Sequence, residues 1–521
     1  MTVVKKLWML LALLLALGMT GAWAEEADEP IVYTSGEWEY VLLEDGTAAI
    51  VYYNGEAEDL TIPAEIDGYA VTGIGDPAFA GCRFLTSVTI PDSVTVIGNN
   101  AFTNCTALTS VTIPDSVTTI GDRSFSACIS LTSITIPDSV TIIGENPFSF
   151  CEKLTNIIVS PDHPTLATIN GVLFDKTEKK LICYPMAYTS SSYAIPQGIH
   201  AIGGEAFAHC FSLTSVTIPD SVTSIGDYAF YWCEALNNVT IPDSVTAVGH
   251  FAFSSCTSLT SLTLPDSVTT IGDGAFSGCD TLTSVTIPSS VTTIGDFAFG
   301  WCESLTSITI PDTVTTIGGD AFVSCTALTS ITYPDTIIIN GDLDFHYCPA
   351  LTSINIPCSV TAIAEEAFIY CSSLTSVTIP DSVTAIGDSA FQNCSALTSI
   401  TIPDSVTSIG EYAFNGCISL TNVIIPDSVT SIAEGTFFKC TALTSVTIPD
   451  SVTTIENVAF VGCSSLTSVT LPGTLTNISH SAFSGCDSIT FTVPRNSYAA
   501  QWCKDNNLRY TYPDSLDWLN D

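Results

Sequence analysis

The stretch that decides the fold runs from Leu108 to Cys128 and reads LTSVTIPDSVTTIGDRSFSAC. In residues 110–113, SVTI, two β-branched apolar residues alternate with serine and threonine, which predicts a short strand with one buried face. The proline that follows ends the strand because it has no N–H to donate, and the next aspartate and serine favour a turn. Phe125 and Cys128 are expected to return to the core, and Gly121 to permit a sharp bend.

The cysteine of A-F-x-x-C recurs every 23 residues, and the proline of I-P-D-S-V follows the same period. A fixed period of about 20–50 residues predicts a solenoid, because each unit can bury its apolar face only against its neighbours. We expect one solenoid over residues 60–490, built from about 17 units. The recurring residues are named the cysteine ladder and are Cys82, Cys105, Cys128, Cys151, Cys210, Cys233, Cys256, Cys279, Cys302, Cys325, Cys348, Cys371, Cys394, Cys417, Cys440, Cys463 and Cys486.

Two irregularities interrupt the period. Cys151 and Cys210 lie 59 residues apart, which is one unit of 23 plus 36 more. Residues 171–184 between them read as two apolar runs around a charged turn, so we expect a variant unit with a hairpin insert over residues 152–195. In residues 337–348 the pattern V-T-x-I-G is lost, which predicts a local bulge.

The string A-F-x-x-C-x-x-L-x-x-V-x-I-P-x-x-V-x-x-I-G resembles the BspA-type leucine-rich repeat over about residues 60–490. The resemblance implies a leucine-rich-repeat solenoid with short parallel strands on a concave face and irregular or short helical segments on the convex side. It also implies the two caps that a solenoid needs, a β-hairpin segment in residues 25–59 and an α/β segment in residues 491–521. Adhesion to host proteins, other cells or matrix is implied by the same resemblance.

Residues 1–24 have the three parts of a secretory signal peptide. Lys5 and Lys6 precede an apolar run over residues 7–17, and the sequence AWA at residues 22–24 is a small-x-small cleavage site. The apolar run is short for a membrane span. We therefore expect a secreted, extracellular protein with no transmembrane segment in the mature chain, either free or associated with the cell surface.

The chain has 53 acidic and 12 basic residues, a formal net charge of -41, and is 46% apolar. A chain this apolar can bury a core, which argues against a disordered acidic protein. Nucleic acid is not an expected partner, because binding phosphates needs a surface of lysine and arginine. Residues 181–438 contain no lysine or arginine, so basic partners or cationic surfaces are favoured electrostatically.

The cysteine ladder is interpreted as a row of buried free thiols. Secretion favours disulfides, but a residue repeated at one inward position among Phe and Leu behaves as a small buried hydrophobe. No C-x-x-C pair or partnering histidine accompanies the ladder, so we expect no metal site there. Cys183, Cys358 and Cys503 lie off the ladder and are expected to be the more reactive thiols.

No pattern in the sequence points to catalysis, and we expect neither catalytic residues nor a cofactor. The motifs G-x-S-x-G and H-E-x-x-H and the phosphate loop do not occur. Acidic residues recur in two rows, one after the proline and one after the glycine of each unit, and such rows cannot single out one acid and one base. We interpret both rows as turn caps, with Ca²⁺ bridging neighbouring carboxylates as the alternative.

Departures from the repeat mark the candidate binding residues. The residue before the ladder cysteine is mostly small or polar, but it is aromatic at Trp232, Trp301, Tyr347 and Tyr370, and Tyr231 adjoins the first of these. These rings suit protein or sugar contact, and packing between units explains them equally well.

Two further groups extend this list of candidates. The insert supplies three cations, Lys176, Lys179 and Lys180. The outward Ser-x-Thr positions, such as Ser307 and Thr309, form a row of hydroxyls that is either a wide binding face or merely a surface compatible with strands.

These features favour a secreted, non-catalytic binding or adhesion scaffold that presents an extended repeat surface to an extracellular protein or glycan. A structural repeat protein of the cell envelope, without a discrete ligand, is the alternative. A cation- or ice-binding array is a more remote one. We expect the protein to be a monomer.

Overall fold

The computed structural model describes residues 30–335, 337–340 and 343–513. The predicted signal peptide lies outside these residues. The chain divides into two compact units, an N-terminal unit up to Thr257 and a C-terminal unit from Ser258 onward. Both are built from 23-residue turns. The pairing of neighbouring strands shows this length directly, because Ser87 pairs with Ser110 and Ser353 pairs with Ser376.

The N-terminal unit begins with the first strands of an eight-stranded sheet, which are β1 Tyr33–Ser35, β2 Trp38–Leu42, β3 Ala48–Tyr53, β5 Glu65–Ile66 and β6 Tyr69–Ile74. β1, β2 and β3 pair antiparallel in that order, and Gly46, with φ +80°, lies in the turn between β2 and β3. β3 then pairs in parallel with β6, which starts the solenoid. The predicted hairpin cap is therefore confirmed.

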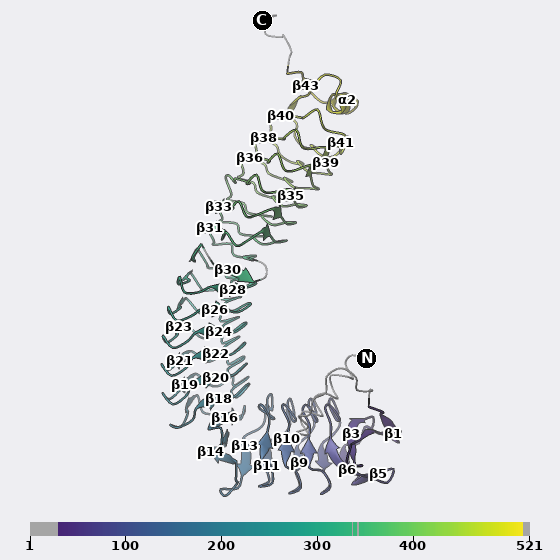
Figure 1. Ribbon diagram of the computed structural model, residues 1–521, viewed down its shortest axis with the longest axis vertical. Helices are drawn as coiled ribbons and strands as arrows, with labels where there is room; N and C mark the ends of the chain where they lie inside the picture. Colours follow the sequence, from purple (N-terminus) through teal and green to yellow (C-terminus); the bar gives the residue numbers. More distant parts are fainter. Residues whose placement is uncertain (1–29, 336, 341–342, 514–521) are drawn as a thin grey trace, which may run out of the picture. The chain divides into compact units, whose positions relative to one another are not determined.

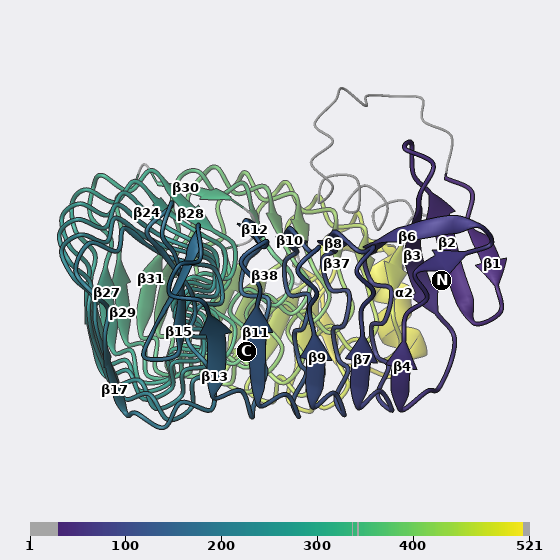
Figure 2. The ribbon, with the colours of Figure 1, turned by 90° about the horizontal axis from the view of Figure 1, so that it is seen from below.

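Most turns carry two short parallel strands, one in the expected Ser-x-Thr segment and a second, not predicted, in the Thr-Ile pair before the glycine. The Ser-x-Thr strands before the insert are β4 Asp59–Thr61, β7 Ser87–Thr89, β9 Ser110–Thr112, β11 Ser133–Ile136 and β13 Asn156–Val159. The second strands are β8 Val96–Ile97, β10 Thr119–Ile120 and β12 Ile142–Ile143. Figure 2 shows the two rows along opposite edges of this part of the unit.

The insert is an antiparallel meander of three strands, β14 Leu166–Ile169, β15 Val172–Asp175 and β16 Lys180–Cys183. β16 pairs in parallel with β18 Ala201–Ile202, so the meander feeds back into the solenoid. The Tyr184 N–H donates to the Ala206 carbonyl oxygen at 2.8 Å, as the Phe79 N–H does to that of Ala101. Tyr184 thus takes the place that phenylalanine holds in a regular turn.

The N-terminal unit continues after the insert with β17 Ser192–Ala194, β19 Ser215–Thr217, β20 Ser224–Ile225, β21 Asn238–Thr240 and β22 Ala247–Val248. In the C-terminal unit the Ser-x-Thr strands are β23 Ser261–Thr263, β25 Ser284–Thr286, β27 Ser307–Thr309, β29 Ser330–Thr332, β31 Ser353–Asn355, β33 Ser376–Thr378, β36 Asn422–Ile424, β38 Ser445–Thr447, β40 Ser468–Thr470 and β42 Thr490–Thr492. Its second strands are β24 Thr270–Ile271, β26 Thr293–Ile294, β28 Thr316–Gly318, β30 Ile338–Asn340, β32 Ala362–Ile363, β34 Ala385–Ile386, β35 Ser408–Ile409, β37 Ser431–Ile432, β39 Thr454–Ile455 and β41 Asn477–Ile478.

The C-terminal unit ends in the expected α/β cap, helix α2 Tyr498–Asp505 followed by β43 Tyr510–Thr511 (Figure 1). Ser497 is the N-cap, because its side-chain oxygen accepts the Ala500 N–H. Trp502 is buried against the last turn, with its ring 6.1 Å from that of Phe483. Within the described ranges α2 is the only helix, so hydrogen-bonded turns replace the short helical segments that the resemblance allowed.

A column of stacked phenylalanines forms the centre of each unit. The rings of Phe79 and Phe102 lie 4.8 Å apart with planes 3° apart, and those of Phe391 and Phe414 lie 5.4 Å apart with planes 1° apart. Leucine, isoleucine and valine of every turn surround this column and are buried with it. The core therefore consists of identical layers, each of which depends on its neighbours for burial.

The predicted role of Gly121 as a bend residue was wrong. Its φ does not lie in the left-handed region, and a Cβ there would lie 2.4 Å from Asn99 Oδ1 and 2.6 Å from Asn99 N. The glycine is therefore required by the close approach of two successive turns, not by a sharp bend.

Candidate binding site

The side of each turn that lacks strands contains two corner positions, and the backbone at most of them is left-handed. The first corner residue lies five residues before the ladder cysteine, and the second directly precedes it. At the second corner φ is positive in all seventeen turns, between 56° and 79°. Hydrogen bonds to the next turn fix this geometry, as from the Trp301 N–H to the Val323 carbonyl oxygen at 2.7 Å. Residues other than glycine adopt this conformation at a cost of roughly 1–2 kcal/mol.

Four of the five predicted aromatic binding residues occupy the second corner. Trp232, Trp301 and Tyr347 each have φ 57°, and Tyr370 has φ 62°. Their exposed fractions are 41%, 43%, 50% and 42% in that order. Close to half of each residue's surface thus remains in contact with solvent, at a backbone position that favours glycine. Packing alone therefore explains them poorly, and the corner positions become the candidate binding surface.

In the C-terminal unit the exposed rings form two separate pairs. Trp301 stacks on Phe297, the first corner residue of its own turn, with ring centroids 5.8 Å apart and planes at 15°. Tyr347 stacks on Tyr370 of the next turn, at 5.2 Å and 17°. Ser324 occupies the second corner of the turn between the two pairs. The rings of each pair are thereby held in place as flat surfaces.

In the N-terminal unit sequence reasoning missed two members of the same row. Phe150 and His209 precede Cys151 and Cys210, so they are second corner residues on either side of the insert. Their ring centroids lie 4.1 Å apart, and the His209 ring lies 5.2 Å from that of Trp232. Counting the ladder across the insert would have placed these three rings side by side.

A pocket of about 280 Å³ lies beside this cluster and is lined by Arg123, Phe150, Glu205, Ala208, Tyr228 and Tyr231. Tyr228 and Tyr231 stand almost at right angles, with centroids 5.4 Å apart and planes at 86°. Tyr231, a predicted binding residue, is half-buried, and its ring lies 5.9 Å from that of Trp232. The predicted pair Tyr231 and Trp232 thus belongs to a larger aromatic cluster with a pocket at its side.

One ion pair lines this pocket, and two buried polar atoms, one in its lining and one on neighbouring His209, have no hydrogen-bond partner. The Arg123 guanidinium contacts Glu205 Oε1. Glu205 is 7% exposed, and its Oε2 has no hydrogen-bond partner. His209 is also 7% exposed with an unpartnered Nε2, and burial lowers its pKa to about 4, so the ring is neutral at pH 7. Unpartnered buried polar atoms are costly and identify groups that a ligand or water can satisfy.

Two of the three predicted lysines make intramolecular contacts around the insert. Lys180 Nζ lies 2.5 Å from Glu145 Oε1, and Lys176 Nζ donates to the His163 carbonyl oxygen. Lys179 is exposed in the hairpin turn, with φ 52°. The insert therefore presents one uncommitted cation of the three at most, and the other two hold the variant turn in place.

Ser307 and Thr309 flank Ile308 on β27, and both hydroxyl residues are exposed while Ile308 is 3% exposed. β27 pairs in register with β29, so that Ser307 lies beside Ser330 and Thr309 beside Thr332. The alternation places a row of hydroxyls on the outer face of the strands. The row is chemically uniform here, because Ser and Thr of one strand lie beside Ser and Thr of the next.

The ladder cysteines are free and, with the exception of half-buried Cys82, buried. Their thiols make a repeated contact: Cys302 Sγ lies 3.2 Å from the Phe276 carbonyl oxygen of the preceding turn, and Cys105 Sγ 3.2 Å from that of Phe79. Burial raises the pKa of Cys302 well above its ordinary value. The cysteine is thus a small core residue that also donates a weak hydrogen bond.

The expectation of three reactive thiols off the ladder was wrong for two of them. Cys183 is 1% exposed and Cys503 is 0% exposed. Burial raises the pKa of both, to about 12 for Cys503, so neither is a ready thiolate. Cys358 alone of the three is exposed.

The acidic row after the glycine bonds to the backbone of the next turn. Asp273 Oδ1 accepts the Asp296 N–H at 2.9 Å, and Asp296 Oδ1 accepts the Gly319 N–H at 2.9 Å. These contacts are the turn caps that the sequence suggested. Across the described residues, no three His, Cys, Asp or Glu side chains lie close enough to hold a metal ion.

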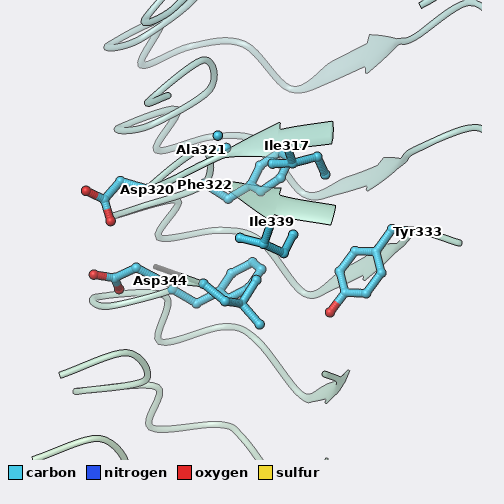
Figure 3. A pocket seen from close by; sticks show the side chains of 10 residues that line it. Ile317, Asp320, Ala321, Phe322, Tyr333, Ile339 and Asp344 are labelled. Atoms are coloured by element: carbon cyan, nitrogen blue, oxygen red, sulfur yellow. The ribbon is translucent and has the colours of Figure 1, made fainter. Parts of the chain in front are cut away.

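The irregular turn at residues 337–348 encloses a cavity of about 10 Å³. Figure 3 shows Ile317, Phe322 and Ile339 around it, with the carboxylates of Asp320 and Asp344 directed away. A volume this small holds one water at most. It is a packing defect where the repeat pattern lapses, not a ligand site.

The stacked 23-residue turns, with parallel strands and a leucine-rich core, define a leucine-rich-repeat solenoid. The family model described as "BspA type Leucine rich repeat region" matches residues 72–194, 183–302, 292–401 and 384–503. The chain therefore belongs to the BspA-type leucine-rich repeat family. In the part of the chain that the structure describes, no helix is long and apolar enough to cross a membrane.

Several solved structures are similar to this chain. A leucine-rich repeat protein from Bacteroides ovatus is 30% identical, covering 89% of this chain and 100% of its own, with a TM-score of 0.41. A leucine rich cell surface protein from Faecalibacterium prausnitzii is 28% identical, covering 95% and 97%, with a TM-score of 0.31. A leucine-rich repeat protein from Eubacterium ventriosum is 25% identical, covering 74% and 94%, with a TM-score of 0.40. None of the curated proteins searched matches the chain.

Proposed function

We propose that the protein is a secreted, non-catalytic binding scaffold that uses its aromatic corner residues to contact an extracellular protein or glycan. The observation that carries the proposal is the exposure of Trp232, Trp301, Tyr347 and Tyr370 at left-handed corners. Such positions favour glycine, so a tryptophan or tyrosine there needs a reason other than the fold. Contact with a partner supplies that reason.

The repeated architecture supports binding over a long surface. Each turn adds one second corner residue, and stacked turns present these residues side by side within each compact unit. Membership of the BspA-type family fits a scaffold of this kind. Because a fold does not fix a function, the aromatic corners rather than the fold carry the proposal.

Charge favours a partner with basic or neutral groups. No lysine or arginine occurs in residues 181–438, which hold all four exposed aromatic corners. The acidic rows on both sides of the turns repel acidic surfaces and attract basic ones. We therefore expect binding of a basic partner to weaken as the salt concentration rises.

The direct experiment measures binding of the purified full chain to immobilised extracellular matrix proteins, bacterial surface preparations and a glycan array. The variants are Trp232→Gly and Trp301→Gly, because glycine keeps the left-handed backbone. Ser324→Gly is the matched control, since Ser324 has φ 56° at the same corner position. Saturable binding that both tryptophan variants weaken supports the proposal. Binding that neither variant changes would contradict it.

A further inference from the structure

The pocket beside Glu205 has a chemistry that an extended scaffold does not need. We propose that it binds a single pyranose ring of a neutral glycan. The inference rests on the proposed binding function and names the chemical class of one partner. It is carried by the walls of the pocket, by the unpartnered carboxylate oxygen in it and by the balance of charge.

The pocket exists because the regular row of first corner residues is broken at the insert. The first corner position between Arg123 and Glu205 belongs to Asn146, which is 3% exposed and is not left-handed. Asn146 Nδ2 donates to the Glu205 carbonyl oxygen at 2.7 Å. Since this asparagine turns inward, the Arg123 and Glu205 side chains meet over it. The insert thereby creates a site that no regular turn has.

The walls are aromatic and held in place from behind. Tyr228 stacks on Phe251, with ring centroids 5.1 Å apart and ring planes at 11°. Tyr231 packs edge-on against His209, with ring centroids 5.5 Å apart and ring planes at 76°. Phe150 lines the other side of the pocket, and its ring centroid lies 4.1 Å from that of His209. Pyranose rings carry C–H groups on their faces, which pack well against fixed aromatic rings. The perpendicular Tyr228 and Tyr231 rings offer one wall and one edge to such a ring.

The polar groups match hydroxyls. Glu205 Oε2 is a buried acceptor without a partner, and a sugar hydroxyl in the pocket can donate to it once the Glu205 carboxylate turns toward the ligand. The Arg123 guanidinium has five N–H groups, and its contact with Glu205 Oε1 leaves others to donate to a hydroxyl oxygen. A donor and an acceptor side by side are what vicinal hydroxyls require, because each hydroxyl both donates and accepts.

The charge of the site selects a neutral ligand. The Arg123 cation and the Glu205 anion cancel, and the neighbouring His209 ring is neutral at pH 7. A cationic ligand would meet Arg123 at the pocket, and an anionic ligand would meet Glu205. The volume of about 280 Å³ is just below the ~300–1,000 Å³ typical of ligand pockets, which fits one sugar ring rather than a longer segment.

The experiment titrates the full chain with the methyl glycosides of glucose, galactose, mannose and N-acetylglucosamine, followed by saturation-transfer NMR and calorimetry. Methyl glucuronide and tetramethylammonium are the charged probes. The variants are Tyr228→Gly and Glu205→Gln, and Tyr412→Gly is the control because Tyr412 holds the same corner position at φ 55°. We expect at least one neutral glycoside to bind, with affinity lowered at least tenfold in both variants and unchanged in the control.

Absence of binding by every neutral glycoside, or binding that both variants leave unchanged, would overturn the inference. Preferential binding of tetramethylammonium would overturn it as well, because the site would then select cations. If Glu205→Gln lowers the melting temperature, Tyr228→Gly decides, since glycine suits its left-handed backbone. Binding to matrix proteins is measured in parallel to separate the two proposals. If the chain binds matrix proteins but no glycoside, only this inference is contradicted. If it binds a glycoside but no matrix protein, only the role of the exposed tryptophans is contradicted.

Discussion

The thiol of Cys302 lies 3.2 Å from the carbonyl oxygen of Phe276, which belongs to the preceding turn. The same contact recurs along both compact units, at Cys233 with Phe207 and at Cys417 with Phe391. Most ladder cysteines thus link their own turn to the one before it. This relationship explains why a weak donor, rather than a plain hydrophobe, recurs at one buried position.

Replacing Cys302 separates the two roles of the thiol. Cys302→Ala removes the donor and leaves a small cavity, so we expect a loss of about 1–2 kcal/mol in the free energy of unfolding. Cys302→Ser keeps a donor next to the Phe276 carbonyl oxygen, and we expect it to cost no more than alanine. Chemical denaturation measures both. A serine variant clearly less stable than the alanine variant would show that the thiol acts only as a hydrophobe.

Thiol labelling tests the accessibility of the cysteines. In the native chain we expect iodoacetamide to modify Cys358 first, because it is exposed. Burial raises the pKa of Cys302 and of most of its ladder neighbours, so these thiols are expected to react only on unfolding. Mass spectrometry of native and denatured samples gives the order. Early modification of Cys183 or Cys503 would be inconsistent with their burial.

The acidic row is predicted to stabilise the stack through its oxygens rather than its charge. Asp296→Ala removes the acceptor for the Gly319 N–H and is expected to cost about 1 kcal/mol. Asp296→Asn keeps an acceptor oxygen, and Asn99 already plays this part by accepting the Asp122 N–H at 2.8 Å. We expect Asp296→Asn to melt at or above the wild-type temperature. Equal destabilisation by both changes would refute the capping role.

His209 is predicted to make stability fall in acid. Burial lowers its pKa from the ordinary 6.5 to about 4, so between these values the unfolded chain binds a proton that the folded chain does not. The contribution of neutral His209 is therefore complete above pH 6.5 and is lost as the pH falls towards 4. His209→Phe resembles Phe150 at the same corner and does not titrate. We expect the melting temperature of His209→Phe minus that of the wild type to rise as the pH is lowered from 7 to 4. A difference that does not change with pH would contradict the burial of the imidazole.

Much of the fold could be predicted because its determinants are local. The alternation in residues 110–113, the proline after it and the 23-residue period predict strand, turn and stack without reference to distant residues. The second strand, such as Thr119–Ile120, is only two residues long and has no pattern of its own. The role of Gly121 was missed because it depends on the distance to the preceding turn, which sequence alone does not give.

The site could be predicted only in part. Trp232 and the other exposed aromatic corners stand out as departures from the repeat. The pocket was missed because Arg123 and Glu205 meet only when the insert folds away and Asn146 turns inward. Lys180 was expected at a binding surface, whereas it pairs with Glu145. The sequence shows which residues are charged, but the tertiary structure determines which other residue each charged side chain contacts.

The central claim is that aromatic corners serve binding and not the fold, and Trp301→Gly tests it most directly in one preparation. The free energy of unfolding and the affinity for the matrix or glycan partner are measured on the same variant, with Ser324→Gly as control. Relief of the left-handed backbone offsets the lost contact with Phe297, so we expect stability to be unchanged or raised by about 1 kcal/mol. Affinity is expected to fall at least tenfold. A variant that loses stability and keeps its affinity would show that Trp301 serves the fold, and would contradict the claim.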